Sequence, residues 1–185
     1  MRLLYKFLSI SMLCILVTSS CSNDNKSIKD KVQELKNKPS YPFDQAETIE
    51  VFSYKSKFDT ENSFSDFLEQ NISKSKRTKD IFDNNQLNIK ERVQLKPAQI
   101  LRLTEILYQQ SCADEIVGNC FTPRHALVFF DKAGDPFAYT EICLECSNAS
   151  YSAGFSKFQL CQSKVDSINS LFTELGITYF YEPIL

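Results

Sequence analysis

The chain has 185 residues and a mass of 21.3 kDa, which is enough for one ordinary domain and too little for two. Its 21 Lys and Arg residues stand against 23 Asp and Glu residues, and the pI is near 5.5. This balance leaves no basic surface for neutralising phosphates, so we exclude nucleic acid as a partner. Hydrophobic residues at 43% and charged residues at 24% are typical of a globular protein.

The first twenty residues have the order and the size of a secretion signal. Two basic residues stand before a mainly apolar run from Phe7 to Val17, and the small residues 18–20 lead into Cys21. The apolar run has about half of the ~20 residues that a helix needs to cross a bilayer. We therefore interpret residues 1–20 as a signal peptide that is removed.

The small residues, the cysteine and the polar residues 22–26 resemble the lipobox of bacterial lipoproteins, which signal peptidase II cleaves. The resemblance implies that Cys21 receives a diacylglyceryl group and that its new amino group receives a further acyl chain such as palmitate. Two or three such chains hold a protein in a membrane, because each buried methylene contributes ~0.8 kcal/mol. We expect a protein anchored by lipid at Cys21, with its domain in the periplasm or at the cell surface.

An alternative stays open at this cysteine. Thr18 and Ser20 also fit a site for signal peptidase I, which would release a soluble secreted protein and leave Cys21 as an ordinary cysteine. The chain after the signal has five cysteines besides Cys21. If Cys21 is lipidated, an odd number of cysteines is left for disulfides, and if it is not, the number is even.

Residues 21–44 are predicted to form a polar tether, and residues 45–185 a single domain with a cysteine-rich second half. Prolines at positions 39 and 42 prevent a regular helix at the end of the tether. A short amphipathic helix within it is indicated by three apolar residues at helical spacing, Ile28, Val32 and Leu35.

Three elements are predicted in the first half of the domain. β-branched and aromatic residues favour a strand over 47–54. Apolar residues at helical spacing indicate a helix or a structured loop over 64–72, and the basic residues 73–79 are interpreted as a solvated loop. Residues 87–95 alternate between apolar and polar side chains, which predicts a strand with one buried and one solvated face.

Next in the chain come a helix and a hairpin. Pro97 fits the first turn of a helix that ends before Ser111. Two strands, 125–131 and 137–144, form an antiparallel hairpin in which Gly134 can take the positive φ of a short turn.

The last predicted elements are a helix from Ser163 to Leu175, followed by Gly176 at its C-terminal end, and a short strand over 177–181. The elements together predict an α+β fold. We expect an antiparallel sheet of about four to six strands with two or three helices packed on it.

All five cysteines of the domain lie in the last half of the chain, and the oxidising space outside the cytoplasm makes them disulfide candidates. A short-range pair such as Cys112 with Cys120 would close the loop between them. The candidates are Cys112, Cys120, Cys143, Cys146 and Cys161.

Cys143 and Cys146 have the C-x-x-C spacing of a redox pair or a metal knuckle. A thioredoxin-type pair needs a helix behind it, and residues 147–151 offer no helical pattern. Residues three apart in a strand face opposite sides, so the two sulfurs meet only if the strand ends in a turn near Leu144. A c-type haem is excluded because Ser147 stands where that motif has His.

Zinc is the alternative cofactor, because thiolates and an imidazole can form a tetrahedral site. Only one C-x-x-C is present and the exported setting favours oxidation, so structural disulfides are preferred to metal. The candidate zinc ligands are Cys120, His125, Cys143, Cys146 and Cys161.

His125 is the only histidine, so a Ser–His or Cys–His catalytic pair would have to include it. The chain has no G-x-S-x-G motif, and we interpret His125 as a structural residue. Glu141 is interpreted equally as a residue of the solvated face and as an acid–base group. We predict no catalytic residue and expect a binding or structural module.

Two other functions are weighed against this prediction. The first is an exported zinc or thiol-redox protein that uses the five candidate ligands. The second is an enzyme that pairs His125 with one of the thiols.

Overall fold

The computed structural model describes residues 41–56, 64–72, 82, 88–113 and 120–180. The predicted signal peptide, Cys21, the tether helix and the basic residues 73–79 lie outside the described residues. None of the helices in this described part combines the length and the apolar character that a membrane span requires.

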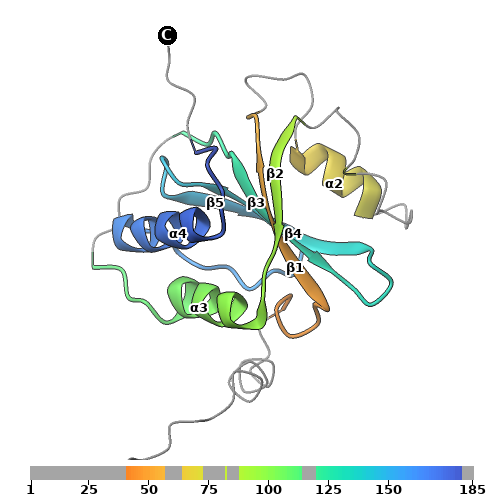
Figure 1. The fold of residues 1–185 in the computed structure, drawn as a ribbon, viewed down its shortest axis with the longest axis horizontal. Coiled ribbons are helices and arrows are strands. Elements are labelled where there is room, and N and C mark those ends of the chain that lie inside the picture. The colour runs from red at the N-terminus through yellow and green to blue at the C-terminus, as the bar shows by residue number, and fades with distance from the viewer. Residues whose placement is uncertain (1–40, 57–63, 73–81, 83–87, 114–119, 181–185) are drawn as a thin grey trace, which may run out of the picture.

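The protein is an α+β fold built on one five-stranded antiparallel sheet, in the order β2-β1-β3-β4-β5 (Figure 1). This confirms the predicted fold class and the expected numbers of strands and helices. The elements are β1 (Thr48–Tyr54), α2 (Phe64–Ile72), β2 (Ile89–Gln94), α3 (Pro97–Tyr108), β3 (His125–Phe130), β4 (Pro136–Cys143), β5 (Asn148–Tyr151) and α4 (Gln162–Glu174).

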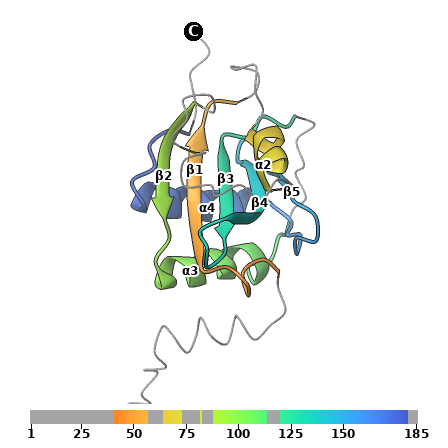
Figure 2. The same cartoon turned by 90° about the vertical axis from the view of Figure 1, so that its right-hand side faces the viewer.

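Helices cover the two faces of the sheet unequally, with α3 and α4 on one face and α2 on the other (Figures 1 and 2). The central strand β3 is buried along its whole length, and its side chains alternate between the two faces. Leu127 and Phe129 join the large core beneath α3 and α4, whereas Ala126 and Val128 join a smaller core beneath α2.

Residues 41–44, predicted as the end of the tether, pack against the domain. Phe43 is 7% exposed, and its ring centroid lies 4.9 Å from that of Phe129. The Tyr41 hydroxyl donates to the carbonyl oxygen of Phe137 at 3.3 Å, and the Ser156 N–H donates to the Tyr41 carbonyl at 2.9 Å. The apolar area of these two aromatic rings outweighs the polar composition of the segment around them.

The local patterns that predicted the helices and the hairpin are confirmed. Pro97 opens α3, and the turn between β3 and β4 places Gly134 at φ +81°. α4 begins at Gln162, one residue earlier than predicted, with Cys161 as its N-cap and no side-chain cap. Gly176 follows its last turn at φ +86°.

Two strand predictions differ from the structure. Residues 177–180 form no strand, because the hydrogen bonds of Thr178 and Tyr179 go to side chains of the sheet. The short strand β5 pairs with β4 and was not predicted, because the alternation of Ala149 and Tyr151 with polar residues covers only four positions.

Candidate functional site

The cysteines of the domain form two disulfides and leave one free thiol. Cys112 is joined to Cys161 across 49 residues, with the Cα atoms 5.7 Å apart. Cys143 is joined to Cys146, with the Cα atoms 5.2 Å apart. Cys120 is exposed and unpaired, so the predicted pairing of Cys112 with Cys120 is wrong. Cys112 follows α3 and Cys161 caps α4, so the contact between the two helices selects the partner.

The Cys143–Cys146 pair meets the geometric condition derived from the sequence. Strand β4 ends at Cys143, and residues 144–147 form a turn closed by a 3.3 Å hydrogen bond from Ser147 N–H to the Leu144 carbonyl. Ser147 follows the two cysteines at a positive φ of 47°, where the chain passes from the turn into β5. We call residues 143–146 the disulfide turn.

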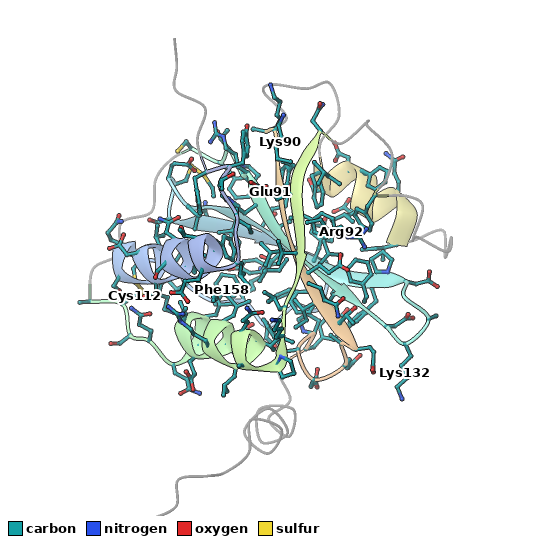
Figure 3. All side chains as sticks on the ribbon, in the orientation of Figure 1. Lys90, Glu91, Arg92, Cys112, Lys132 and Phe158 are labelled. Carbon is teal, nitrogen blue, oxygen red and sulfur yellow. A yellow bond between two sulfur atoms is a disulfide. The ribbon has the colours of Figure 1, made fainter. Side chains whose placement is uncertain are left out.

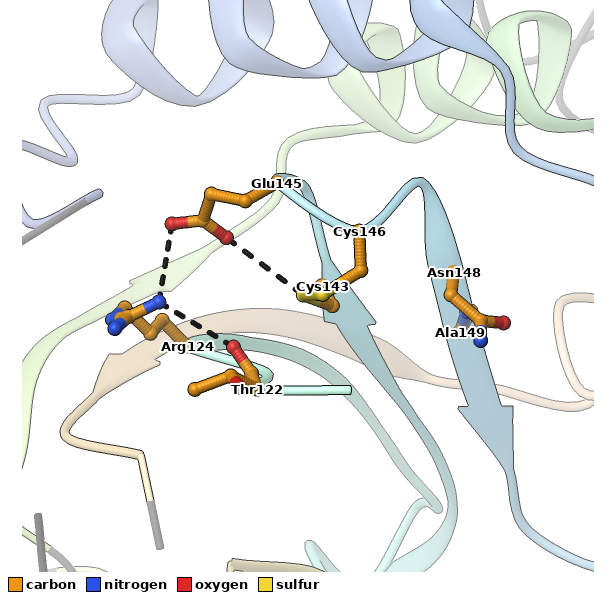
Figure 4. The surroundings of a disulfide bond; sticks show 7 residues. All are labelled: Thr122, Arg124, Cys143, Glu145, Cys146, Asn148 and Ala149. Carbon is orange, nitrogen blue, oxygen red and sulfur yellow. Dashed lines mark hydrogen bonds and ion pairs between the residues drawn. A yellow bond between two sulfur atoms is a disulfide. The ribbon is translucent and has the colours of Figure 1, made fainter. Parts of the chain in front are cut away.

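The surroundings of the disulfide turn are unlike those of an active redox pair. Cys143 and Cys146 are 0% and 2% exposed, and β5 follows instead of a helix. Glu145 places one carboxylate oxygen 3.8 Å from the Cys143 sulfur and the other 3.2 Å from Nη1 of Arg124 (Figure 4). Reactive thiols in redox enzymes stand instead beside positive charge and partly exposed.

The five predicted zinc ligands do not converge. Cys143 and Cys146 are bonded to each other, Cys161 is bonded to Cys112, and Cys120 is exposed. Among the residues that the structure describes, no three His, Cys, Asp or Glu side chains are grouped so as to hold a metal ion.

His125 is buried between two aromatic rings at the beginning of β3. Its ring centroid lies 5.3 Å from that of Phe172 on α4 and 5.2 Å from that of Phe180. Nε2 lies 3.0 Å from the carbonyl oxygen of Tyr179, and since a carbonyl can only accept, Nε2 carries the proton. Nδ1 is buried without a hydrogen-bond partner among the described residues.

Burial lowers the pKa of His125 to about 4, and this outweighs the hydrogen bond to Tyr179 and the charge of Glu91, which raise it. The imidazole is therefore neutral at pH 7. No described contact of His125 is with a cysteine, so the structure assembles no Cys–His pair for the enzyme hypothesis.

A polar row crosses three adjacent strands on the face that α4 covers. Ser53 on β1 stands in register with Glu91 on β2 and with His125 on β3. The hydroxyl of Ser53, which is fully buried, donates to a carboxylate oxygen of Glu91. Because that hydroxyl is directed to the carboxylate and Nε2 of His125 to Tyr179, the row lacks the nucleophile–base hydrogen bond of a hydrolase.

The segment Ile177–Phe180, which we call the strap, lies against this row. Oε1 of Glu91 accepts from Thr178 N at 2.9 Å, Thr178 Oγ1 at 2.6 Å and Tyr179 N at 3.2 Å. Partial burial raises the pKa of Glu91, but the hydrogen bonds from Ser53, Thr178 and Tyr179 lower it more, so the net shift is downward. Ser53, Glu91 and Tyr179 were not predicted as a group, because only the strand register and the path of the strap bring them together.

Two cavities lie at opposite ends of the sheet. One, of about 260 Å³, is lined by α4 residues, by Phe180 of the strap and by Leu144 and Glu145 of the disulfide turn. The other, of about 640 Å³, is a groove between the beginning of β1, the end of β2 and the β3–β4 turn.

Arg92 and four carboxylates dominate the lining of this groove. The Arg92 guanidinium carbon lies 5.2 to 5.9 Å from the ring centroids of Phe52, Phe82 and Phe130, and its Nε donates to Glu50. Lys132 adds a second positive charge, whereas the acidic lining residues are Glu47, Glu50, Asp131 and Asp135. Figure 3 shows Arg92 on β2 and Lys132 on the hairpin turn.

Glu141 lies on the α2 face and is 4% exposed, so it is not part of a solvated face. It accepts hydrogen bonds from the hydroxyls of Tyr54 at 2.7 Å and Ser150 at 3.3 Å. Burial, and then the charge of Glu141, raise the pKa of Tyr54 well above its usual range. Neither of the two cavities described above is lined by Glu141.

No protein-family model, curated protein or solved structure matches this chain.

Proposed function

We propose that the protein is a lipoprotein of the bacterial cell envelope, held by lipid at Cys21, whose domain binds a ligand or a partner rather than catalysing a reaction. The observation that carries this proposal is the cysteine pairing. Four cysteines of the domain pair with one another, so neither of the two described disulfides involves Cys21. An oxidising space suits the two disulfides, and Cys21 remains available for lipid.

The arrangement of the domain supports an orientation relative to the membrane. The described chain begins at Tyr41 and enters β1 at Thr48, at the groove end of the sheet, and β1 runs toward Ser53 beside the strap. A tether attached before Tyr41 would therefore place the groove nearer to the membrane. The strap and the disulfide turn would face away from it.

The groove supports a binding role. Its lining has four carboxylates against two positive side chains, so charge complementarity favours a cationic ligand. In the site that the structure describes, the groups needed for hydrolytic, redox or zinc chemistry are not brought together. Binding is thus the activity that the geometry supports best.

The anchoring is tested by mass spectrometry of the processed amino terminus and by membrane fractionation. We expect a diacylglyceryl-modified Cys21 in the native protein and release of the Cys21→Ala variant into the soluble fraction. Cys120→Ala is the matched control, because it also removes a cysteine that forms no disulfide within the domain. An unmodified Cys21, or a disulfide between Cys21 and Cys120, would overturn the proposal in favour of a released protein.

The binding role is tested by NMR titration with two small probes of opposite charge, putrescine and succinate. We expect putrescine to shift amide signals of the groove and succinate to leave them unchanged. Glu50→Gln should weaken the response to putrescine, whereas Glu174→Gln, which removes a carboxylate on α4, should not. No response to either probe would leave the groove without support and favour a structural role.

A further inference from the structure

We propose that the strap is an acid-released cover: it lies closed over the row of Glu91, Ser53 and His125 at neutral pH, and it opens when these two titratable side chains bind protons. Opening would widen the cavity beside the disulfide turn, because Phe180 of the strap is one of its walls. This device goes beyond the proposed function and does not depend on the lipid anchor.

The strap is held by side chains instead of a strand ladder. Glu91 accepts hydrogen bonds from the backbone N–H groups of Thr178 and Tyr179, and His125 donates to the carbonyl of Tyr179. One residue of the strap, Tyr179, therefore contacts both titratable groups of the row through its own backbone. A change of protonation at either group acts directly on the strap.

Protonation of Glu91 opposes the closed state. As a carboxylate, its two oxygens accept from Ser53, Thr178 and Tyr179. A bound proton converts one of these oxygens into a donor that faces other donors, and it removes the charge that strengthens the remaining bonds.

Protonation of His125 opposes the closed state for a different reason. Nδ1 is buried without an acceptor, and the ring lies between Phe172 and Phe180. A proton at Nδ1 would place a charge among aromatic rings, and displacement of Phe180 would let water reach it.

The charged groups around the row add to the coupling. Arg124 disfavours a positive imidazole, whereas Glu91 favours it. The Lys90 ammonium lies 5.8 Å from the centroid of the Tyr179 ring. Protonation of Glu91 removes the negative charge that favours a positive imidazole, so the effect of Arg124 on His125 is no longer offset by Glu91.

Opening moves the part of the strap that follows Ile177. Ile177 itself stays with α4, because it is 1% exposed in the large core and its N–H donates to the Phe172 carbonyl at 3.0 Å. Phe180 forms a wall of the 260 Å³ cavity together with Leu144 and Glu145, which lie in the disulfide turn. Movement of Phe180 would remove one wall of this cavity and widen it.

The experiment measures hydrogen exchange of the Thr178 and Tyr179 amides in the full processed chain. After correction for intrinsic rates, we expect their protection to fall about 25-fold between pH 7.5 and pH 5, from the ordinary pKa of His near 6.5 and its value of about 4 in the closed state. Their protection should be lower than that of β3 amides such as Leu127 and should depend little on added urea, because only the strap opens.

Variants assign the effect to the two groups. Glu91→Gln should lower the protection of the strap amides about ten- to a hundred-fold at pH 7.5, since charged hydrogen bonds are lost. His125→Phe keeps a ring between Phe172 and Phe180 and should abolish most of the pH dependence above pH 5. Glu50→Gln is the matched control on the neighbouring strand and should leave strap protection unchanged.

Two results would overturn the proposal. The first is strap protection equal to that of the β3 amides at every pH, which would mean that the strap opens only when the whole domain unfolds. The second is a strap that opens independently of the β3 amides but whose protection is unchanged between pH 7.5 and pH 5. Both results can be read from the unmodified protein, so a variant that fails to fold does not affect the test.

Discussion

The hydroxyl of Tyr54 donates a 2.7 Å hydrogen bond to the carboxylate of Glu141, and both side chains are buried, at 1% and 4% exposure. The two residues lie on β1 and β4, which are separated in the sheet by β3. A buried carboxylate is tolerated only when donors compensate for the water that it has lost. The packing of the sheet face beneath α2 therefore depends on this one polar contact.

Replacement of Tyr54 by Phe tests this contact. The variant keeps the ring stacked on Phe64, whose centroid is 4.3 Å away, but removes one donor from Glu141. We expect a loss of about 1 to 3 kcal/mol in the free energy of unfolding, measured by urea denaturation. Tyr41→Phe, which removes a partly buried bond to a neutral carbonyl, should cost about 1 kcal/mol or less. Equal losses in the two variants would contradict the role given to the carboxylate.

The two disulfides are expected to contribute unequally to stability. Cross-linking restricts the unfolded chain more when the closed loop is longer, and the sequence separations are 49 residues for Cys112–Cys161 and 3 for Cys143–Cys146. Replacing both cysteines of the long-range pair by Ser should lower the free energy of unfolding by about 4 kcal/mol, against about 2 kcal/mol for the short-range pair. Denaturation curves of the two double variants check this order, and the reverse order would refute the entropic explanation.

Stability should fall as the solution becomes acidic, with a contribution from His125. Its pKa is about 4 in the folded protein and near 6.5 when unfolded, so the unfolded state binds the proton first. The contribution of neutral His125 to the free energy of unfolding is complete above pH 6.5. About 3 kcal/mol of it is lost as the pH falls toward 4.

The measurement for His125 is the free energy of unfolding across this pH window. In His125→Phe the decline between pH 6.5 and pH 4 should be smaller by that amount. An identical pH profile for the variant and the native protein would show that His125 is not held neutral by burial.

Cys120 should be the only cysteine of the domain that reacts with iodoacetamide in the folded protein. It is exposed and unpaired, whereas the other four form the two disulfides. Mass spectrometry of the labelled protein should show one carbamidomethyl group on the domain, and five after reduction and unfolding. Labelling of Cys143 or Cys146 without reductant would instead show a reduced disulfide turn.

Elements whose pattern is local could be predicted from the amino-acid sequence. The alternation over 89–94 appears in β2 as half-buried and exposed residues in turn, Pro97 opens α3, and Gly134 turns the hairpin. These features depend on side-chain periods and on backbone preferences of single residues, which a sequence displays directly. The α+β class followed from the same elements, because an amphipathic helix and a one-faced strand must cover each other.

Tertiary structure alone decided the partners. Cys112 pairs with Cys161 instead of Cys120 because α3 and α4 lie side by side, and Ser53 joins Glu91 and His125 because of the strand register. Glu141 is buried because α2, which is distant in sequence, covers its face of the sheet. The period of the apolar residues indicates which side of a helix or strand is buried. It does not indicate which other element covers that side, because this depends on the packing of the whole chain.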